Sequence, residues 1–238
     1  MKIGVITDIH NNLPALETAL RFFEQEGCEE ILCCGDIIGI GPYPEETVSR
    51  VRQLENFHAV CGNHDCYLTE GLRFPWPDGM EDGEAAHHYW EHGLLSAESK
   101  AYLHSLPRQL LLERENVRIC LSHYPLTADG KFSPFVRRPS AGECDRLFAE
   151  MPQADVYLYG HDHLPSFQKG RALYLNFGSL GAPYRAGDIA RCGVLTVEKG
   201  KTRWETVSLR YDLAAVIDRI RTLRYSDWEM ISKIFFGA

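Results

Sequence analysis

The sequence has no apolar run long enough to cross a membrane and no excess of basic residues. A membrane-spanning helix needs roughly 18–20 consecutive apolar residues, and no segment approaches that length. The 238 residues include 25 Lys and Arg against 33 Asp and Glu, which gives a formal charge of −8. General nucleic-acid binders show a basic face or stripe, so this balance argues against that class. It does not exclude a phosphate-bearing substrate, because a local site can oppose the overall charge.

Signals for secretion and for a cysteine-rich metal site are also missing. Asp8 comes too early in the chain for the apolar core of a signal peptide, so we expect a cytoplasmic protein. Cys61 and Cys66 are close in sequence, but no second close pair completes a four-ligand zinc site. The chain has no internal repeat, low-complexity tract or linker. We therefore expect one domain over residues 1–238, whose 45% apolar content can form a sizeable core.

Short apolar runs alternate with helical patterns over the first 210 residues. The runs are rich in β-branched residues and predict buried strands. One helix is predicted between Asn12, its N-cap, and Gly27, and we also expect a helical insert over about residues 84–106 and a helical tail over about residues 212–236. The predicted strands are Ile3–Thr7, Glu30–Cys34, His58–Cys61, Val117–Ser122, Asp155–Tyr159 and Leu173–Leu175, followed by a hairpin of Gly193–Val197 and Arg203–Leu209.

Polar side chains follow five of the predicted strands at the point where each strand ends. In a sheet of mostly parallel strands, the C-terminal ends meet along one edge, where ligands bind. Carboxylate, amide and imidazole donors suit Mn, Fe, Zn, Ni or Co, in contrast to a thiolate site. The residues concerned are Asp8, His10, Asp36, Asn63, His64, Asp65, His123, His161, Asp162 and His163.

These donors are too numerous for one metal ion, and Asp36 is placed where it could bridge two. Two dications about 3.5–4 Å apart can bind a phosphate and activate water for in-line attack. A His that binds no metal could then protonate the leaving oxygen near neutral pH. Taken singly, each Asp or His has an ordinary structural role as a cap, a turn former or a buried imidazole. Their recurrence at five strand ends is what favours a functional site.

Five motifs, in this order, resemble those of the calcineurin-like metallophosphoesterases. They are D-x-H at Asp8, G-D at Gly35, G-N-H-D at Gly62, the lone His123 and G-H-x-H at Gly160. The resemblance covers roughly residues 1–210. It implies an α/β fold, a four-layer α/β/β/α sandwich of two mixed β-sheets flanked by helices.

The same resemblance implies roles for individual residues. His64, next to the expected ligand Asn63, would be the general acid and would contact phosphate. Asp65 would either orient His64 or act as a turn or cap residue. Asp36 would be shared by two metal ions. One ion would be bound by Asp8, His10, Asp36 and His163, and the other by Asp36, Asn63, His123 and His161.

Further residues narrow the resemblance to a subgroup. The segment from Gly35 to Pro42 resembles the G-D-x-x-G-x-G-P turn of small bacterial members related to symmetric diadenosine tetraphosphatases and Ser/Thr protein phosphatases. Two positions depart from the family pattern, since Phe177 stands where Pro is usual and Tyr124 stands where Gly is usual. Both departures leave the expected metal ligands intact, so they bear only on the substrate.

Candidate substrate contacts lie in the loops near these motifs. Tyr124 could narrow the site or stack on a base, and an exposed Arg could bind phosphate by bidentate hydrogen bonds or remain a solvated surface residue. A second His pair, His88 and His92, stands at i and i+4 on one helical face; such a pair can bind a metal but is more often simply solvated. The arginines in question are Arg137, Arg138 and Arg185.

The sequence therefore predicts a dimetal-dependent phosphoesterase that hydrolyses phosphoester or phosphoanhydride bonds. The expected substrate is a phosphate-containing small molecule of nucleotide type, which would make the enzyme a phosphodiesterase or a dinucleoside polyphosphate hydrolase. The cofactors would be two ions drawn from Mn, Fe, Zn, Ni or Co. Two alternatives remain, a Ser/Thr protein phosphatase and a non-catalytic, metal-bound interaction scaffold. The presence of His64 argues against the scaffold.

Overall fold

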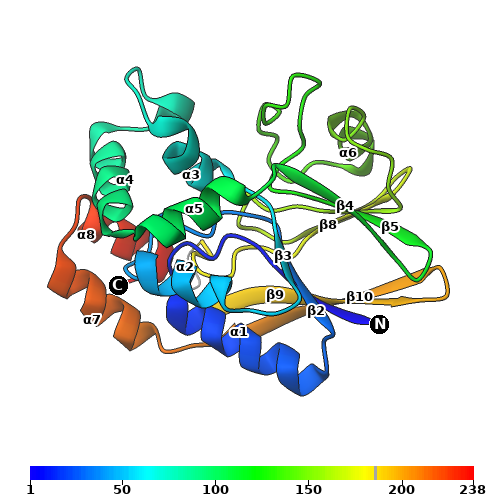
Figure 1. Ribbon diagram of the computed structural model, residues 1–238, viewed down its shortest axis with the longest axis horizontal. Coiled ribbons are helices and arrows are strands. Elements are labelled where there is room, and N and C mark those ends of the chain that lie inside the picture. Colours follow the sequence, from blue (N-terminus) through cyan, green and yellow to red (C-terminus); the bar gives the residue numbers. More distant parts are fainter. Residues whose placement is uncertain (185–186) are drawn as a thin grey trace.

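Two five-stranded β-sheets pack face to face in the computed structural model, which describes residues 1–184 and 187–238 (Figure 1). Each sheet has three adjacent strands that pair in parallel and two strands that pair antiparallel with a neighbour, so both sheets are mixed. The first sheet has the order β10 (Lys201–Arg210), β9 (Ile189–Glu198), β1 (Lys2–Ile6), β2 (Glu30–Cys33), β3 (Phe57–Ala59). The second has the order β4 (Gln109–Arg114), β5 (Val117–Ser122), β6 (Val156–Leu158), β8 (Leu173–Asn176), β7 (Ser166–Lys169).

Alternation along the central strands creates three apolar interfaces between four layers. Successive side chains of a strand point to opposite faces, so Val5, Leu32 and Leu121 lie between the two sheets. The other face of the first sheet packs against α1 (Leu13–Glu26), α2 (Pro44–Arg52) and α7 (Leu213–Leu223). The other face of the second sheet packs against α6 (Ala141–Leu147). This arrangement confirms the predicted α/β/β/α sandwich.

Helix α1 shows how local sequence fixes one of these layers. Asn12 caps the helix by accepting a hydrogen bond from the Ala15 N–H at 3.1 Å, and Gly27 ends it with a left-handed φ of 68°. Phe23 is buried on the sheet directly over Gly4, where an added Cβ would lie 2.8 Å from the ring. Full burial of a Phe contributes about 1.5–3 kcal/mol. The predicted helix is confirmed at both ends.

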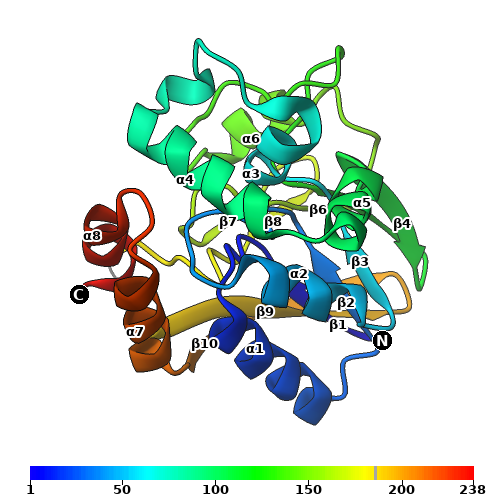
Figure 2. The same ribbon diagram turned by 60° about the vertical axis from the view of Figure 1, so that its left-hand side comes forward.

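A second helical region rises beside the sheets and meets the C-terminal helices. It contains α3 (Asn63–Cys66), α4 (Asp82–Leu94) and α5 (Ala97–Ser105). After α7, the chain forms α8 (Trp228–Ile231) and a π-helical turn, Ser232–Phe236. Both ribbon views place α4 next to α8 (Figures 1 and 2), and the Trp90 ring of α4 stacks on Tyr225 at 4.6 Å. Helices thus occupy the segments in which we expected an insert and a tail.

The elements that were not anticipated from the sequence include β4, β7 and α6, besides the short α3. Strands β4 and β7 each lie at an edge of the second sheet, where one side of the strand is unpaired. Edge strands are often short or polar, and the Ser-Phe-Gln-Lys sequence of β7 has no apolar run. Leu111 of β4 is 49% exposed. The hydrophobic pattern of β7 is therefore weak, whereas β4 contains three consecutive leucines, Leu110–Leu112, and could have been predicted.

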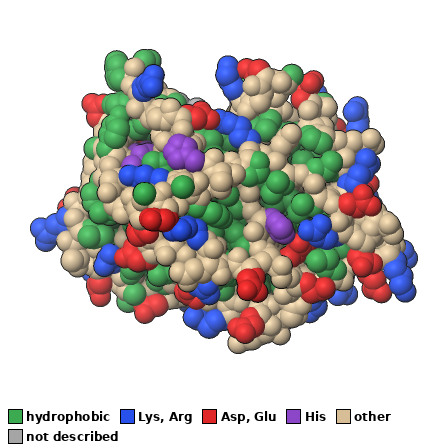
Figure 3. Space-filling model, viewed as in Figure 1, with side chains coloured by type: hydrophobic (Ala, Val, Ile, Leu, Met, Phe, Trp, Pro, Cys, Tyr) green, Lys and Arg blue, Asp and Glu red, His purple; other side chains and the backbone are tan. Residues whose placement is uncertain are grey.

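The surface carries charges of both signs. On the face shown in Figure 3, Lys and Arg side chains are interspersed with Asp and Glu, and the described residues of this face form no continuous basic patch. None of the helices in the described segments is both long enough and apolar enough to cross a membrane.

Candidate active site

Loops that follow five strands place eight of the predicted site residues together. The strands are β1, β2 and β3 of the first sheet and β5 and β6 of the second, and each loop leaves from the C-terminal end of its strand. The eight side chains therefore converge from both sheets on the edge at which parallel strands end. They are Asp8, His10, Asp36, Asn63, His64, His123, His161 and His163.

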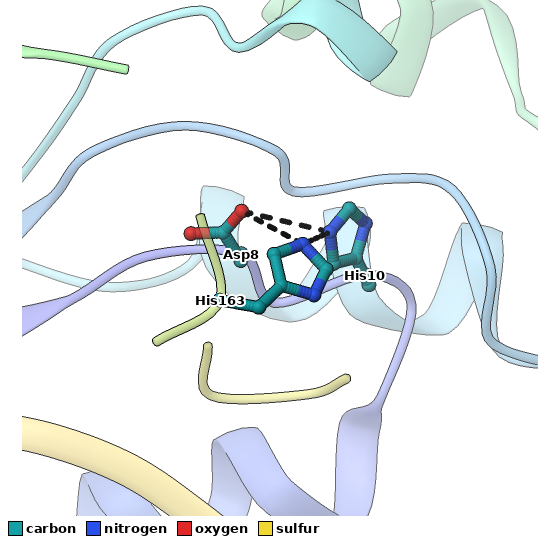
Figure 4. A group of neighbouring side chains, drawn as sticks. All are labelled: Asp8, His10 and His163. Carbon is teal, nitrogen blue, oxygen red and sulfur yellow. Dashed lines mark hydrogen bonds and ion pairs between the residues drawn. The ribbon is translucent and has the colours of Figure 1, made fainter. Parts of the chain in front are cut away.

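A first donor group consists of Asp8, His10 and His163 (Figure 4). The Nε2 atoms of His10 and His163 lie 3.0 Å apart, and Asp8 Oδ1 lies 3.7 Å and 3.2 Å from them. On the far side of each ring, Nδ1 donates to a backbone carbonyl, that of Ile38 at 3.1 Å and that of Ala182 at 2.8 Å. A carbonyl can only accept, so in the neutral rings each Nε2 presents a lone pair to the same point.

A second donor group lies beside the first and shares Asp36 with it. Asp36 Oδ2 lies 3.3 Å from His123 Nε2 and 3.7 Å from His10 Nε2, so this carboxylate stands between the two groups. His161 Nδ1 lies 3.2 Å from His123 Nε2 and 3.0 Å from Asn63 Oδ1. The other nitrogen of His123 donates to the Cys34 carbonyl at 2.9 Å, which fixes that ring as it fixes His10.

The protonation behaviour of these groups matches a cation site. Burial raises the pKa of Asp36 well above its usual value, and the Asp8 and Asp65 carboxylates raise it further. Burial would also raise the pKa of Asp8, but His163 and His10 hold it well below the usual value. Burial lowers the pKa of His123 to about 3, which keeps the ring in the neutral form that binds metals.

The donor set fits a divalent metal ion. Asp8 Oδ1 is buried and has no hydrogen-bond partner in the described structure. Among the described ion pairs, those of Asp8 and Asp36 join them only to histidines, so no Lys or Arg compensates these carboxylates. Buried charges without such partners normally coordinate a metal. Oxygen and imidazole donors at this density suit borderline divalent ions.

The backbone at the site adopts a conformation that costs energy. Five of the eight residues have a left-handed φ, between 48° and 74°. For a residue with a Cβ this conformation costs roughly 1–2 kcal/mol, although Asp, Asn and His tolerate it better than most. Such strain concentrates where side-chain direction is constrained by function. The five residues are Asp8, His10, Asp36, His161 and His163.

His64 lies at the edge of both donor groups. Its backbone N–H donates to Asp36 Oδ1 at 2.9 Å, and its Nε2 lies 4.0 Å from Asp36 Oδ2. The ring packs edge-on against His10, with centroids 4.9 Å apart. Burial lowers the pKa of His64 well below its usual value, and the His10 and His88 imidazoles lower it further. A bound phosphate anion would oppose this effect, because a nearby negative charge favours the protonated ring.

Comparison with known families decides the identity of this arrangement. The model of the calcineurin-like phosphoesterase superfamily domain matches residues 1–200. The chain belongs to this superfamily. It is a metal-dependent phosphoesterase, as its motif order predicts.

The chain is similar to other proteins at moderate identity over most of its length. The uncharacterized protein MJ0912 of Methanocaldococcus jannaschii is 28% identical over 260 residues, covering 99% of this chain and 98% of its own. Phosphodiesterase YfcE of Escherichia coli is 28% identical over 210 residues, covering 82% of this chain and 87% of its own. The family match ends at residue 200, before β10, α7 and α8.

Two solved structures share the fold over the whole chain. A metallophosphoesterase from Sphaerobacter thermophilus has a TM-score of 0.77 at 22% identity and covers 100% of this chain and 99% of its own. The hypothetical protein PH1004 from Pyrococcus horikoshii has a TM-score of 0.82 at 20% identity and covers 100% of this chain and 98% of its own. Both likenesses extend through the C-terminal helices of the phosphoesterase described here.

Asp65 of this phosphoesterase holds the turn that carries the site. Of the two roles predicted for it, the structure shows the cap and turn role. Its carboxylate accepts hydrogen bonds from the N–H groups of Gly62 at 2.9 Å, Ile37 at 3.0 Å and Ile38 at 3.2 Å. Burial raises its pKa to about 6 against these backbone hydrogen bonds, which lower it. Asp65 therefore ties the loop after β3 to the loop after β2.

Sequence reasoning missed a buried support for the phosphoesterase site, Glu91 on α4. Its carboxylate is fully buried and accepts hydrogen bonds from Asn11 Nδ2 at 2.6 Å and from the Gly39 N–H at 2.8 Å, and it lies 2.6 Å from His88 Nδ1. The His88 ring in turn packs 5.1 Å from that of His64. A single Glu in a helix usually faces solvent, so its residue type did not indicate that Glu91 is buried. The only available signal was the polar composition of α4, which is unexpected for a helix inside the fold.

His88 and His92, the pair considered as a third metal site, lie next to the buried Glu91. His88, Glu91 and His92 do lie within metal-binding distance of one another. Burial would lower the pKa of His88, but hydrogen bonds with Glu84 and Glu91 raise it to about 9. Burial would raise the pKa of Glu91, but the His88 hydrogen bond and charge lower it to about 2. These groups form an ion pair at neutral pH, so His88 has a partner without a metal.

The predicted substrate contacts of the phosphoesterase occupy different environments. Tyr124 is buried, its ring lies 5.2 Å from His161, and its hydroxyl accepts a hydrogen bond from the Val136 N–H at 2.9 Å. The Arg137 side chain is 64% exposed and pairs with Asp162 at 3.5 Å. The backbone N–H of Arg138 donates to the same Asp162 at 3.0 Å. Arg185 lies outside the described residues.

Proposed function

We propose that the chain hydrolyses phosphodiester bonds of nucleotide-type substrates with two metal ions. The observation that carries this proposal is the position of Asp36, whose Oδ2 lies within 3.7 Å of one imidazole in each donor group. Asp8, His10 and His163 complete the set for one ion, and Asn63, His123 and His161 complete it for the other. Candidate ions are Mn, Fe, Zn, Ni and Co. Relatives named as phosphodiesterases support this bond type.

The chain's own residues position and protonate the substrate. When bound, the two ions supply Lewis acidity toward phosphate oxygens and lower the pKa of water. His64, anchored by its backbone N–H on Asp36, is placed to donate a hydrogen bond to the phosphate and a proton to the leaving oxygen. The carbonyls of Ile38, Cys34 and Ala182 keep three imidazoles in fixed orientation, so no reorganisation is needed as charge develops.

A cavity beside His64 and His163 supports a nucleotide as substrate. It has a volume of about 300 Å³, at the lower end of the ~300–1,000 Å³ usual for small-molecule sites. Its described lining has five apolar residues, four histidines (His64, His87, His88 and His163) and the carboxylates of Glu84 and Asp227, and includes no Lys or Arg. A flat base bearing amino donors would fit between the apolar side chains and the two carboxylates. The apolar lining residues are Ile40, Met230, Ile231, Ile234 and Phe235.

Removal of metal is the first test of the proposed reaction. We expect a chelator to lower hydrolysis of bis(p-nitrophenyl) phosphate by about 10²-fold or more, since metal ions contribute several kcal/mol of transition-state stabilisation. Added Mn²⁺ should restore the rate, and metal analysis of the restored protein should find two equivalents per chain. Full activity in folded, metal-free protein would refute metal dependence, and full activity with a single equivalent would refute the two-ion site.

Filling the cavity is the test of the nucleotide substrate. We expect Ile234→Trp to raise KM for 2′,3′-cyclic AMP by about 10-fold or more, because a blocked apolar pocket loses one to three kcal/mol of binding. Methyl p-nitrophenyl phosphate and a phosphoserine peptide serve as comparison substrates. Lys233→Trp is the matched control, since Lys233 is on the same turn but exposed. An equal KM for the nucleotide in both variants, or faster hydrolysis of the phosphopeptide, would contradict the proposal.

A further inference from the structure

Two cysteines bracket the loop that carries Asn63 and His64. Cys61 directly precedes Gly62, Cys66 is the last residue of α3, and the sequence between them is Gly-Asn-His-Asp. Their sulfur atoms lie 2.9 Å apart. Both side chains are buried, with 4% and 6% of their surface exposed. A thiol pair in contact therefore encloses a predicted metal ligand and the predicted general acid.

This contact is special among the cysteines of the chain. All eight lie in described segments and are free thiols, and no other two have their sulfurs in hydrogen-bond contact. A disulfide needs a sulfur–sulfur distance of about 2.05 Å, so closing this pair requires an approach of roughly 0.9 Å. In reducing compartments, disulfides of this kind are transient and sense redox conditions.

We propose that Cys61 and Cys66 form a reversible oxidation site, in which hydrogen peroxide converts the two thiols into a disulfide that displaces Asn63 and His64 and lowers phosphoesterase activity. A thiol reductant restores the open loop. This inference concerns control of the site and does not depend on which phosphate ester is the substrate.

The surroundings give the two thiols different roles. Cys66 lines a cavity of about 410 Å³ together with Arg108 and Lys131, so a small oxidant can reach it. Cys61 does not line this cavity. Cys66 is therefore the attacking thiol and Cys61 the resolving one.

The chemistry balances with peroxide as the only oxidant. The Cys66 thiolate attacks one peroxide oxygen, an S–O bond forms, the O–O bond breaks and hydroxide takes up a proton to leave as water. The Cys61 sulfur then attacks the Cys66 sulfur, the S–S bond forms, and the S–O bond breaks. The departing hydroxide takes the Cys61 proton as a second water. The two thiols lose two electrons, and the peroxide gains them.

The loop moves on the Cys66 side when the bond forms. The Cys61 N–H donates to the Pro107 carbonyl at 2.8 Å, which holds this end of the loop. Gly62 cannot shift toward Asp36, because even a Cβ on this glycine would lie 2.0 Å from Asp36 Oδ1. The displacement therefore falls on α3, which carries Asn63 and His64. A misplacement of about 1 Å in a catalytic group costs on the order of 10²-fold in rate.

The test follows the thiols and the activity in the same samples of the full chain. Peroxide is added to the protein with and without bound metal, removed with catalase, and followed by intact mass and thiol titration. We expect a mass loss of two hydrogens, a loss of two thiols, and a fall of about 10²-fold in hydrolysis of bis(p-nitrophenyl) phosphate after metal is resupplied. Dithiothreitol should reverse all three changes.

Serine variants distinguish the disulfide between Cys61 and Cys66 from oxidation of other residues. Cys61→Ser and Cys66→Ser should keep their activity under peroxide, and Cys61→Ser should accumulate a sulfenic acid on Cys66 that dimedone traps. Cys28→Ser, which replaces a partly exposed thiol elsewhere, should respond like the unaltered chain. Absence of the disulfide in the unaltered chain would overturn the proposal, and so would a disulfide that forms without loss of activity. The mass and thiol measurements test disulfide formation even if the ester used is not hydrolysed.

Discussion

Replacement of His64 by glutamine is expected to lower kcat for an aryl phosphodiester by about 10²–10⁴-fold, the usual contribution of a general acid. The ring stands beside Asp36 and both donor groups, and its Nε2 lies 4.0 Å from Asp36 Oδ2. We expect this nitrogen to face the phosphate. Glutamine keeps the backbone N–H that Asp36 accepts but has no proton to transfer, so chemistry should suffer and folding should not.

Metal content and leaving-group dependence distinguish catalysis from damage to the site. The His64→Gln protein should bind the same number of metal equivalents as the unaltered chain, and its loss of kcat should grow as the leaving alcohol becomes more basic. His104→Gln is the control, because His104 is exposed on α5, far along the chain from the motifs. If His64→Gln lowers kcat by less than threefold for every leaving group in the series, His64 is not the general acid.

Replacement of Glu91 by alanine is expected to lower the free energy of unfolding by about 3–5 kcal/mol, as for a broken buried ion pair. The change would leave the buried Asn11 Nδ2, the Gly39 N–H and the buried His88 without their acceptor. Each buried donor left unsatisfied costs about 1–3 kcal/mol. Urea unfolding of metal-free protein gives the value directly.

The pH dependence of this loss has a definite form. The pKa of Glu91 falls from 4.5 to about 2 in the fold, so its contribution is present above pH 4.5 and disappears as the pH falls toward 2. The pKa of His88 rises from 6.5 to about 9, so its contribution is complete below pH 6.5 and disappears as the pH rises through 9. The difference between the unaltered chain and Glu91→Ala should therefore be largest between pH 4.5 and 6.5.

Two variants on α4 complete this comparison. Glu91→Gln keeps an oxygen acceptor and should cost less than Glu91→Ala. Glu84→Ala removes a partly exposed carboxylate 3.9 Å from the same His88 and should cost less than about 1 kcal/mol, as exposed pairs do. Equal losses for Glu84→Ala and Glu91→Ala would contradict the assigned role of Glu91.

The central sheets and the positions of the site residues could be predicted because both follow from local sequence and one rule of topology. Buried parallel strands such as β1 and β2 are continuous apolar runs, and their C-terminal ends must share an edge. Asp8 and Asp36 directly follow such runs, so their meeting needed no knowledge of distant contacts. The same reasoning identified α1 from its cap and its glycine stop.

What could not be predicted depends on contacts between segments far apart in the chain. Glu91 lies 80 positions from Asn11, and nothing in its neighbourhood in the sequence indicates that it is buried. The two sulfurs of Cys61 and Cys66 are close in sequence, but their contact depends on how tightly the chain turns into α3. Edge strands such as β7 are held by pairing with a neighbour more than by their own hydrophobicity.

The donor residues are divided between the two sheets. Those after β1, β2 and β3 belong to one sheet and those after β5 and β6 to the other, and His10 meets His163 across 153 positions of sequence. A ligand that binds only the folded chain at 100 times its dissociation constant stabilises it by about 2.7 kcal/mol. An ion bound here would also stabilise the packing of the two sheets against each other. The unfolded chain cannot present these donors together, so affinity for metal would report whether the two halves have docked correctly.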